Sequence, residues 1–269
     1  QKTAYEIRLS LVGSEMCIRD RVTVLDSIDP SVHPSEPTYL NPGAVYVRKS
    51  VTDGNAWAEV LPQVDAVCHQ AAKVGLGADF ADVVDYVHCN DTGTAAGLRA
   101  CHEIGFTGRV VLASSMVVYG EGAYEDLDGA SRRPAPRSRS ALSSGDFGVY
   151  DDRGRPLVPR AVTEDAPVDP RNVYAATKAQ QEFLCSAFSR ETGTAVTALR
   201  YHNVYGPRMP RDTPYSGVAA IFRSALESGC SPAVFEDGGQ LRDFVHVRDV
   251  AHANVLALTR EQPYAGPLN

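Results

Sequence analysis

Short apolar runs alternate with longer helix-like stretches along most of this chain. The apolar runs have the length of buried strands and lie at residues 22–25, 44–47, 65–68, 109–113 and 196–199. The helix-like stretches lie at residues 80–104, 172–188, 217–227 and 247–259. Apolar strands that alternate with helices are typical of a parallel sheet covered on both faces. The pattern therefore predicts an α/β fold built on a doubly wound parallel sheet.

Residues 123–160 interrupt this alternation. The segment holds seven arginines and four prolines but few large apolar residues, so it cannot build much core. We expect a surface insertion, with a hairpin turn near residues 152–154. A solvated loop is the simpler interpretation of so many charges, and contact between an arginine and a nucleotide phosphate is the alternative.

Composition narrows the class of protein further. The chain of 269 residues has a formal net charge of −7, which argues against a nucleic-acid-binding surface. No apolar run is long enough to cross a bilayer, so we expect no membrane partner. The six cysteines are scattered without a CxxC pair, which predicts no metal site or disulfide framework and favours a reducing, cytoplasmic location.

Two residues in the stretch 172–188 give the first indication of chemistry. Tyr174 and Lys178 are four positions apart, so they share one face of a helix. A lysine ammonium near a phenol favours the phenolate and lowers the tyrosine pKa from about 10 toward neutrality. Tyr174 is thus a candidate acid and base, with Ser115 as a second hydroxyl on the same substrate oxygen. On spacing alone, packing plus a solvated charge explains such a pair more simply.

Seven blocks in a fixed order outweigh that simpler explanation. They lie at residues 22–26, 64–72, 90–94, 112–120, 174–178, 200–207 and 242–247. Block 112–120 reads Leu-Ala-Ser-Ser-Met-Val-Val-Tyr-Gly, and block 174–178 reads Tyr-Ala-Ala-Thr-Lys. In this order the blocks resemble the extended short-chain dehydrogenase/reductase superfamily, and within it the NAD-dependent nucleotide-sugar epimerase/dehydratase family. The resemblance points to its UDP-glucose 4-epimerase and dTDP-L-rhamnose 4-epimerase groups.

The resemblance implies a fold, a cofactor and partners. The fold is a Rossmann-like doubly wound sheet over residues 22–200, followed by a small, incomplete substrate-binding lobe at residues 201–269. The cofactor is NAD, the substrate is a nucleotide sugar, and the full-length protein is a homodimer. An insertion placed like residues 123–160 is found in the dTDP-L-rhamnose 4-epimerase group, where paired cysteines resemble a metal knuckle. The segment here has no cysteine, so no metal role is expected.

The resemblance also implies the catalytic residues. Tyr174 exchanges the proton of the sugar 4-hydroxyl, Lys178 lowers the tyrosine pKa and holds the nicotinamide ribose, and Ser115 orients the hydroxyl. A strand-end turn is the alternative role for Ser114 and Ser115. Besides Tyr174 and Lys178, the expected cofactor-binding residues are Asp26, Ala71, Ala72, Asn90 and Ser114.

Several of these roles have alternatives. We expect Asp26 to hold the adenosine ribose, which suits NAD, or otherwise to cap a turn. Asn90 is expected to support the structure near Tyr174 more than to touch substrate.

Asn203 and Arg242 match positions that bind the substrate diphosphate. An ion pair with a neighbouring aspartate, Asp243 or Asp249, is the alternative for Arg242. His69 is expected to be a structural histidine.

Met116 and Val117 bear on the type of reaction. In the related 4,6-dehydratases, acidic residues follow the catalytic hydroxyl residue and help to eliminate water. Met116 and Val117 cannot transfer protons, so the resemblance favours epimerisation at carbon 4 through a 4-keto intermediate. The alternatives are a nucleotide-sugar reductase, decarboxylase or dehydratase of the same superfamily, or a non-catalytic truncated fragment.

The first residues do not fit the resemblance. A dinucleotide-binding half opens with a strand and a glycine-rich turn whose backbone N–H groups hold the pyrophosphate. Gly13, however, is the only glycine before Gly43. We expect residues 1–21 to be a foreign or artefactual segment in place of that strand and turn. Relatives continue past the position of Asn269, so we expect a fragment at both ends.

Overall fold

The computed structural model describes residues 21–29, 37–75, 80–209 and 217–269. The expectation that residues 1–21 are foreign falls almost wholly outside these ranges. Parallel strands in two groups form the centre of the fold. One group pairs β1 (Val22–Leu25) with β2 (Ala44–Val47), and the other has the order β11-β8-β4-β3. Within the described ranges no strand joins the two groups.

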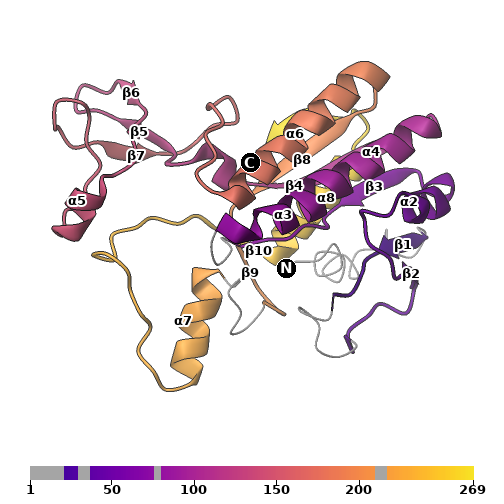
Figure 1. Cartoon of the computed structure of the whole chain (residues 1–269), viewed down its shortest axis with the longest axis horizontal. Helices are drawn as coiled ribbons and strands as arrows, with labels where there is room; N and C mark the ends of the chain where they lie inside the picture. The colour runs from indigo at the N-terminus through magenta and orange to yellow at the C-terminus, as the bar shows by residue number, and fades with distance from the viewer. Residues whose placement is uncertain (1–20, 30–36, 76–79, 210–216) are drawn as a thin grey trace.

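The four-stranded group is covered by helices on both faces (Figure 1). Its parallel strands are β3 (Ala66–His69), β4 (Arg109–Ser115), β8 (Val196–Tyr201) and β11 (Gly266–Leu268). One face carries α4 (Gly93–Glu103) and α6 (Val173–Thr192) with α2 (Gly54–Val60) beside them, and the other carries α8 (Val247–Thr259). The expected α/β class and the parallel sheet are thus confirmed.

Strand β4 divides its side chains between the two helical layers. Val110 and Leu112 belong to the apolar core on the α4 and α6 side, whereas Val111 packs with Ala257 of α8. All four are buried. Because side chains alternate along a strand, the same parity directs Ser114 toward α6.

Most elements lie where the sequence pattern predicts them, with one exception. The stretch expected as a single helix at 80–104 is broken. A 3₁₀ turn, η3 (Phe80–Asp82), and the short α3 (Val83–Tyr86) lead into a π-helical segment, η4 (Val87–Thr92), before α4 begins. Such π segments occur often at functional sites. In the described part of the chain, no helix has the length and apolar character needed to cross a membrane.

Residues 201–269 divide between two parts of the molecule. Helix α8 packs on β3 and β4, and β11 extends the main sheet beside β8. The remainder forms a smaller unit, which we call the outer unit. In it β9 (Asn203–Tyr205) pairs with β10 (Phe244–His246). Helix α7 (Val218–Glu227) also belongs to this unit and lies below the main body in Figure 1. Among the described residues of this region, β9, β10 and α7 therefore lie outside the main sheet.

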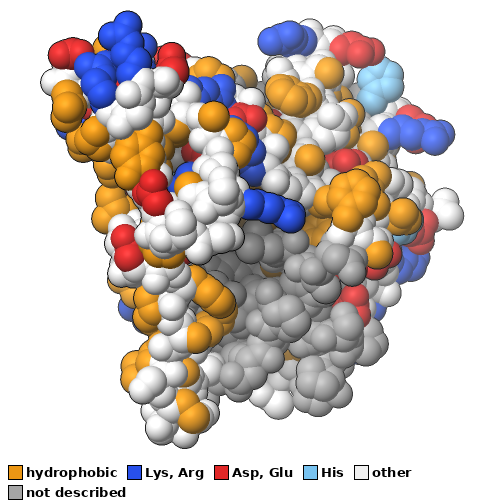
Figure 2. All heavy atoms as spheres, turned by 60° about the vertical axis from the view of Figure 1, so that its left-hand side comes forward, with side chains coloured by type: hydrophobic (Ala, Val, Ile, Leu, Met, Phe, Trp, Pro, Cys, Tyr) orange, Lys and Arg blue, Asp and Glu red, His pale blue; other side chains and the backbone are white. Residues whose placement is uncertain are grey.

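The insertion 123–160 forms a small antiparallel sheet at one end of the molecule. Its strands are β5 (Ala123–Glu125), β6 (Ser131–Arg132) and β7 (Val158–Arg160), in the order β6-β5-β7. A short helix, α5 (Arg139–Ser143), lies beside them. On the face shown in Figure 2, basic and acidic side chains lie close together rather than in separate patches. This mixture suggests that the arginines of the insertion are paired.

Two matching turns organise the insertion. Asp126 and Asp151 each begin a turn that contains a glycine of positive φ three residues later, Gly129 and Gly154. Each aspartate carboxylate accepts hydrogen bonds from the backbone N–H groups two and four residues further on, at 2.8–3.0 Å. The second turn is the hairpin turn expected near residues 152–154, which is thereby confirmed.

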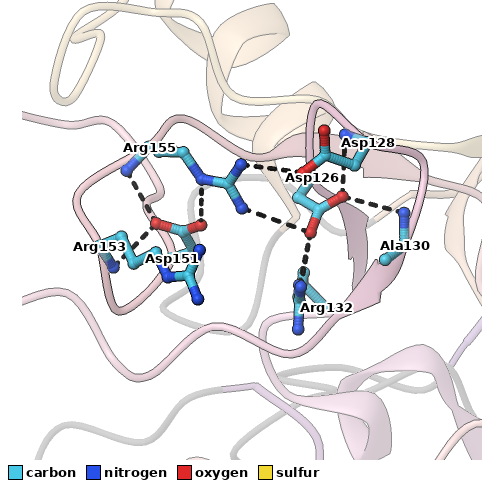
Figure 3. Close-up of polar contacts among 7 residues, drawn as sticks. All are labelled: Asp126, Asp128, Ala130, Arg132, Asp151, Arg153 and Arg155. Atoms are coloured by element: carbon cyan, nitrogen blue, oxygen red, sulfur yellow. Dashed lines mark hydrogen bonds and ion pairs between the residues drawn. The ribbon is translucent and has the colours of Figure 1, made fainter.

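Arg155 joins these turns (Figure 3). Its guanidinium donates to Asp151 and to Asp128, each at 2.9 Å, and lies 3.7 Å from Asp126. The Asp126 side chain is fully buried and also pairs with Arg132 at 2.7 Å. Hydrogen bonds from the Ala130 backbone and from Arg132 hold the pKa of Asp126 below its usual range. Buried carboxylates need such partners. The insertion, which has little apolar core, is therefore held together by paired charges.

Arg155→Met should loosen the insertion and leave the main sheet intact. The substitution retains side-chain length but deprives Asp126 and Asp151 of a shared partner. Backbone amides of residues 123–160 should therefore exchange hydrogen roughly tenfold faster or more, while those of β4 stay protected. Mass spectrometry of hydrogen exchange measures both regions. Arg153→Met is the control, because Arg153 contacts Asp151 through its backbone N–H, which the substitution retains. Equal exchange in the two variants would contradict the assignment.

Candidate active site

A cavity of about 240 Å³ opens at the carboxyl ends of β3, β4 and β8. In an open parallel sheet this edge is where ligands bind, because loops from neighbouring strands converge there. Six predicted site residues line the cavity: Ala72, Ser114, Ser115, Tyr174, Lys178 and Asn203. Four others lie outside its described wall: Asp26, Ala71, Asn90 and Arg242.

Helix α6 brings Lys178 to the end of β4. The side chain is almost inaccessible, and its Nζ donates a hydrogen bond to the carbonyl oxygen of Ala113 at 2.7 Å. Burial lowers the pKa of Lys178 to about 7, and the negative charges of Asp91 and Glu182 oppose this shift. An amine with a pKa near 7 can gain or lose a proton at physiological pH.

Tyr174 lies one helical turn before Lys178 and lines the same cavity. Its ring centroid is 5.9 Å from the Lys178 Nζ and 6.2 Å from the centroid of the Tyr86 ring. Burial raises the pKa of Tyr174 to about 12, although a hydrogen bond with Ser115 acts in the opposite direction. The geometry thus brings one phenol, one amine and one alcohol together.

The prediction that Lys178 lowers the pKa of Tyr174 toward neutrality is wrong for this structure. The pKa of Tyr174 is raised, and burial is the main cause. The Lys178 amine is directed to the Ala113 carbonyl. Burial also disfavours the charged form of each group, so both remain neutral over a wider pH range than free side chains do.

Asp91 is a residue near Lys178 that the sequence analysis missed. One of its carboxylate oxygens is buried and has no hydrogen-bond partner within the described structure. Burial raises the pKa of Asp91 to about 6, and the charge of Lys178 opposes the rise. Its position beside Asn90 in block 90–94 is the signal that could have identified it.

Asn90 connects η4 to the loop after β3 and to α6. Its side-chain amide donates to the Lys73 carbonyl at 3.0 Å and to Thr177 Oγ1 at 2.9 Å, and its Oδ1 accepts from the Lys73 N–H at 2.7 Å. These contacts occupy a fully buried side chain, so Asn90 can affect the cavity only through its neighbours. His69, as expected of a structural histidine, is buried with its Nε2 3.0 Å from Thr94 Oγ1.

The opposite wall of the cavity contains polar residues that were not predicted. Gln70 accepts a hydrogen bond from the Tyr201 hydroxyl at 3.0 Å and donates to Asn254 Oδ1 at 2.9 Å. Asn254 is completely buried behind them on α8. Burial raises the pKa of Tyr201, so it stays protonated. Gln70 directly follows β3 and Tyr201 ends β8, and their strand-end positions are the signal that was available.

Asp26 lies directly after β1, at the carboxyl end of that strand. Its Oδ1 accepts a hydrogen bond from the Ile28 N–H at 2.8 Å, so the turn-capping role given as an alternative is present. Ala72 is in the cavity wall beside Ala71, and both offer only a methyl group. Ser114 also borders the cavity, but its hydroxyl donates to Glu182 of α6, as the parity of β4 requires.

The two residues expected to bind diphosphate lie in different surroundings. Asn203 is in the cavity wall, and its Nδ2 donates to the Asp243 carbonyl at 3.0 Å. Arg242 is exposed, and its guanidinium donates to the Leu241 carbonyl at 2.7 Å. The Asp243 carboxylate lies 3.6 Å from His202 Nδ1. Asn203 therefore faces the cavity, whereas Arg242 lies outside it.

Met116 and Val117 both line the cavity next to Ser115. Among the described residues, no aspartate or glutamate contributes to the cavity wall. The groups proposed to act on a substrate hydroxyl there are therefore Tyr174, Lys178 and Ser115.

Comparison with known proteins agrees with this geometry. Residues 18–266 match the NAD dependent epimerase/dehydratase family, and the chain belongs to that family. It is 35% identical over 247 residues to the dTDP-L-rhamnose 4-epimerase of Burkholderia thailandensis, covering 90% of this chain and 67% of the relative. Two further curated relatives are matched over 60% and 54% of their length.

Solved structures give the same result for the fold. A UDP-N-acetylglucosamine 4-epimerase from Methanobrevibacter ruminantium, in complex with UDP-N-acetylmuramic acid, superposes with a TM-score of 0.73 at 25% identity and covers 97% of this chain and 72% of that chain. The Thermus thermophilus UDP-glucose 4-epimerase, in complex with NAD, gives a TM-score of 0.69 at 25% identity, with 98% and 74% coverage. The Rossmann-like architecture is thus that of nucleotide-sugar epimerases.

Lys178→Met should change the pH dependence of stability. The pKa of Lys178 is about 7 in the folded protein against an ordinary 10.5, so between these values the unfolded state binds more protons. The free energy of unfolding of the parent should therefore rise with pH across this range, by up to about 1.4 kcal/mol per unit, relative to the variant. Urea unfolding followed by circular dichroism at several pH values measures the difference. Lys49→Met, at an exposed lysine, is the control. Parallel curves for parent and Lys178→Met would show that Lys178 is not buried as described.

Proposed function

We propose that this protein epimerises a nucleoside-diphosphate sugar at carbon 4, through a 4-keto intermediate and with NAD as cofactor. The observation that carries the proposal is the cavity itself. It combines Tyr174, Lys178 and Ser115 with the apolar Met116 and Val117 at the carboxyl ends of parallel strands. Proton exchange with a hydroxyl is available there, and no carboxylic acid that could eliminate water lines the described part of the cavity wall.

The residues present fit part of NAD. Asp26 at the end of β1 is proposed to hold the adenosine ribose, and the methyl side chains of Ala71 and Ala72 allow close approach of the cofactor. Lys178 and Tyr174 would border the nicotinamide ribose, with Ser114 and Asn90 supporting them from behind. The turn expected to hold the pyrophosphate falls in residues 1–21, nearly all outside the described ranges. When bound, NAD accepts a hydride from carbon 4 of the sugar and returns it.

Tyr174 would move the proton that accompanies the hydride. In the first half of the cycle its deprotonated phenolate oxygen would receive the proton of the 4-hydroxyl, and in the second half the resulting phenol would return that proton to the same sugar oxygen. Ser115 keeps that oxygen within reach by a hydrogen bond, and its contact with Tyr174 favours the deprotonated phenol. In its charged form Lys178 would favour the phenolate as well, an effect that burial outweighs in the structure itself. Hydride and proton are each removed and returned, so the cycle has no net redox change.

Asn203 and Arg242 are proposed to bind the diphosphate. Asn203 is already in the cavity wall. The positive charge of Arg242 contributes to lowering the pKa of Glu236, whose carboxylate also pairs with Arg137 of the insertion. A guanidinium suits a diphosphate because it donates two parallel hydrogen bonds. Anchored by the diphosphate, the sugar would be able to turn over between the two hydride transfers.

A homodimer is proposed from an apolar surface shared by two neighbouring helical segments. Phe80, Val84 and Val87 are 76%, 72% and 42% exposed along η3, α3 and η4, and Phe183 of α6 is 59% exposed. The segments pack against each other, so these side chains are proposed to form one apolar strip on the paired helices. Two copies could bury such strips against each other as a four-helix arrangement.

The reaction itself can be tested with a panel of nucleotide sugars. The protein, supplied with NAD, should interconvert one of them with its 4-epimer without net change in NAD absorbance, as followed by NMR of the sugar. Tyr174→Phe retains the ring but removes the hydroxyl, so turnover should fall by about 10²–10⁴ while the unfolding midpoint barely moves. A 4-keto-6-deoxy or decarboxylated product would contradict the proposal, and so would near-parental turnover by Tyr174→Phe.

The proposed dimer makes a separate prediction. Phe183→Lys should place a charge in the apolar strip and weaken self-association by roughly tenfold or more. Sedimentation equilibrium over a range of protein concentrations measures the dissociation constant. Phe235→Lys is the matched control, since Phe235 is 80% exposed but lies in the outer unit, away from the strip. Equal effects of the two substitutions, or a monomeric parent, would rule out this interface.

A further inference from the structure

Glu182 links the helix of the site to the ends of two strands. It lies on α6 four residues after Lys178, so both side chains occupy one face of the helix. Its Oε1 accepts hydrogen bonds from the Ser114 hydroxyl and from Arg200 Nε, the latter at 2.9 Å. Its Oε2 accepts from Arg200 Nη2 at 2.7 Å. Ser114 belongs to β4 and Arg200 to β8, so one carboxylate fixes both strands against the helix.

Arg200 extends these contacts to the other side of Ser115. Its Nη1 donates to the Tyr119 hydroxyl at 2.7 Å and to the Glu164 carbonyl at 3.2 Å. Tyr119 ends the 3₁₀ turn η5 (Met116–Tyr119), which begins directly after Ser115. Ser115 therefore lies between Ser114 and the turn η5. Both of these neighbours are hydrogen-bonded to the Glu182–Arg200 pair.

The pair is nearly sealed from solvent. The exposed fractions of the Arg200 and Glu182 side chains are 4% and 10%. Buried ion pairs add little net stability compared with apolar residues of similar size, but they accept few alternative geometries. Such a pair behind a catalytic residue is suited to fixing positions within the site.

Glu182 also lies near the one buried amine of the site. Lys178 donates to a carbonyl group, which leaves its charge without a direct counter-ion in that contact. Asp91 of η4 and Glu182 are the two carboxylates whose charges favour the ammonium form. Among the described residues, the other titratable groups close to Lys178 are Tyr174, whose ring centroid lies 5.9 Å from Nζ, Cys185 and His69.

We propose that Glu182 is a positioning residue of the epimerase site, an inference that rests on the function proposed above. Through Ser114 and Arg200 it holds the Ser115 hydroxyl at the cavity, and its negative charge one turn beyond Lys178 favours the protonated form of the amine. It is not a catalytic residue, since its side chain is not part of the described cavity wall.

The lysine content of the chain permits a direct test. There are only four lysines, Lys2, Lys49, Lys73 and Lys178. In protein labelled with ¹³C at the lysine ε-carbons, each gives one NMR signal whose shift reports protonation, and the signal missing from Lys178→Met identifies Lys178. The midpoint of the Lys178 titration should fall by about one pH unit or more in Glu182→Gln, because an opposite charge nearby has been removed. Glu191→Gln, at an exposed position on the same helix, is the control and should not change it.

A second variant guards against misfolding. Glu182→Gln leaves Arg200 charged and buried without its partner, which can unfold a protein. Glu182→Gln/Arg200→Met removes both charges and keeps side-chain volume, so it should fold and still show the lowered Lys178 midpoint. An unchanged midpoint in every folded Glu182 variant would overturn the proposal.

Kinetics separate this proposal from the proposed function. In a parent that interconverts 4-epimers, Glu182→Gln should lower kcat with little change in KM and move the alkaline limb of the kcat profile to lower pH. A merely structural residue would not move that limb. If the parent has no epimerase activity but the Lys178 midpoint still falls in Glu182→Gln, the function is wrong and the electrostatic role of Glu182 stands. If the parent is active but the limb and the midpoint are unmoved, the role of Glu182 is wrong and the function stands.

Discussion

The hydrogen bond from Lys178 to the carbonyl of Ala113 fixes α6 against the end of β4, and most of the site depends on this contact. The helix turns an unusual number of polar residues inward. Thr177 meets Asn90, Gln181 meets Thr94 and the Asn90 carbonyl, and Glu182 meets Arg200. Apolar packing alone would allow a helix to slide or rotate slightly on a sheet. Directed hydrogen bonds between buried groups allow only one register, because each unmet partner would be left unpaired away from water.

The same burial creates an electrostatic problem that the surroundings partly correct. Removing water raises the pKa of Tyr174 to about 12 and lowers that of Lys178 to about 7, so a neutral phenol and a partly neutral amine are favoured. Base catalysis by this pair needs the ionised forms instead, a phenolate and an ammonium group. Asp91 and Glu182 are placed behind the amine, where they favour its charged form without lining the cavity. Carboxylates in the wall could exchange protons with the substrate themselves, whereas carboxylates behind it only tune Lys178.

The sequence predicted much of this arrangement. Regular alternation of apolar and helical segments was sufficient for the parallel sheet, and the ordered blocks contained Ser115, Tyr174, Lys178 and Asn203, which the structure brings to one cavity. Contacts that depend on three-dimensional packing were not predictable in this way. The π-helical segment at 87–92 contains Asn90, whose hydrogen bonds reach distant parts of the chain, and nothing in the local periodicity indicates it. The direction of the Lys178 amine depends on a carbonyl 65 positions earlier, and the raised pKa of Tyr174 depends on burial by distant parts of the chain.

Directed polar contacts also fix the insertion, which lies at the surface and lacks an apolar core. Its two aspartate turns are joined through Arg155, and a separate pair, Arg137 with Glu236 at 2.8 Å, ties it to the outer unit between β9 and β10. The insertion starts only a few residues after the turn that follows Ser115, and the outer unit contributes Asn203 to the cavity. The Arg137–Glu236 pair therefore joins, away from the sheet, two segments that are each continuous with residues of the cavity wall. Because hydrogen-bonded ion pairs favour particular geometries, a segment without a hydrophobic core can still be held in a defined position beside the site.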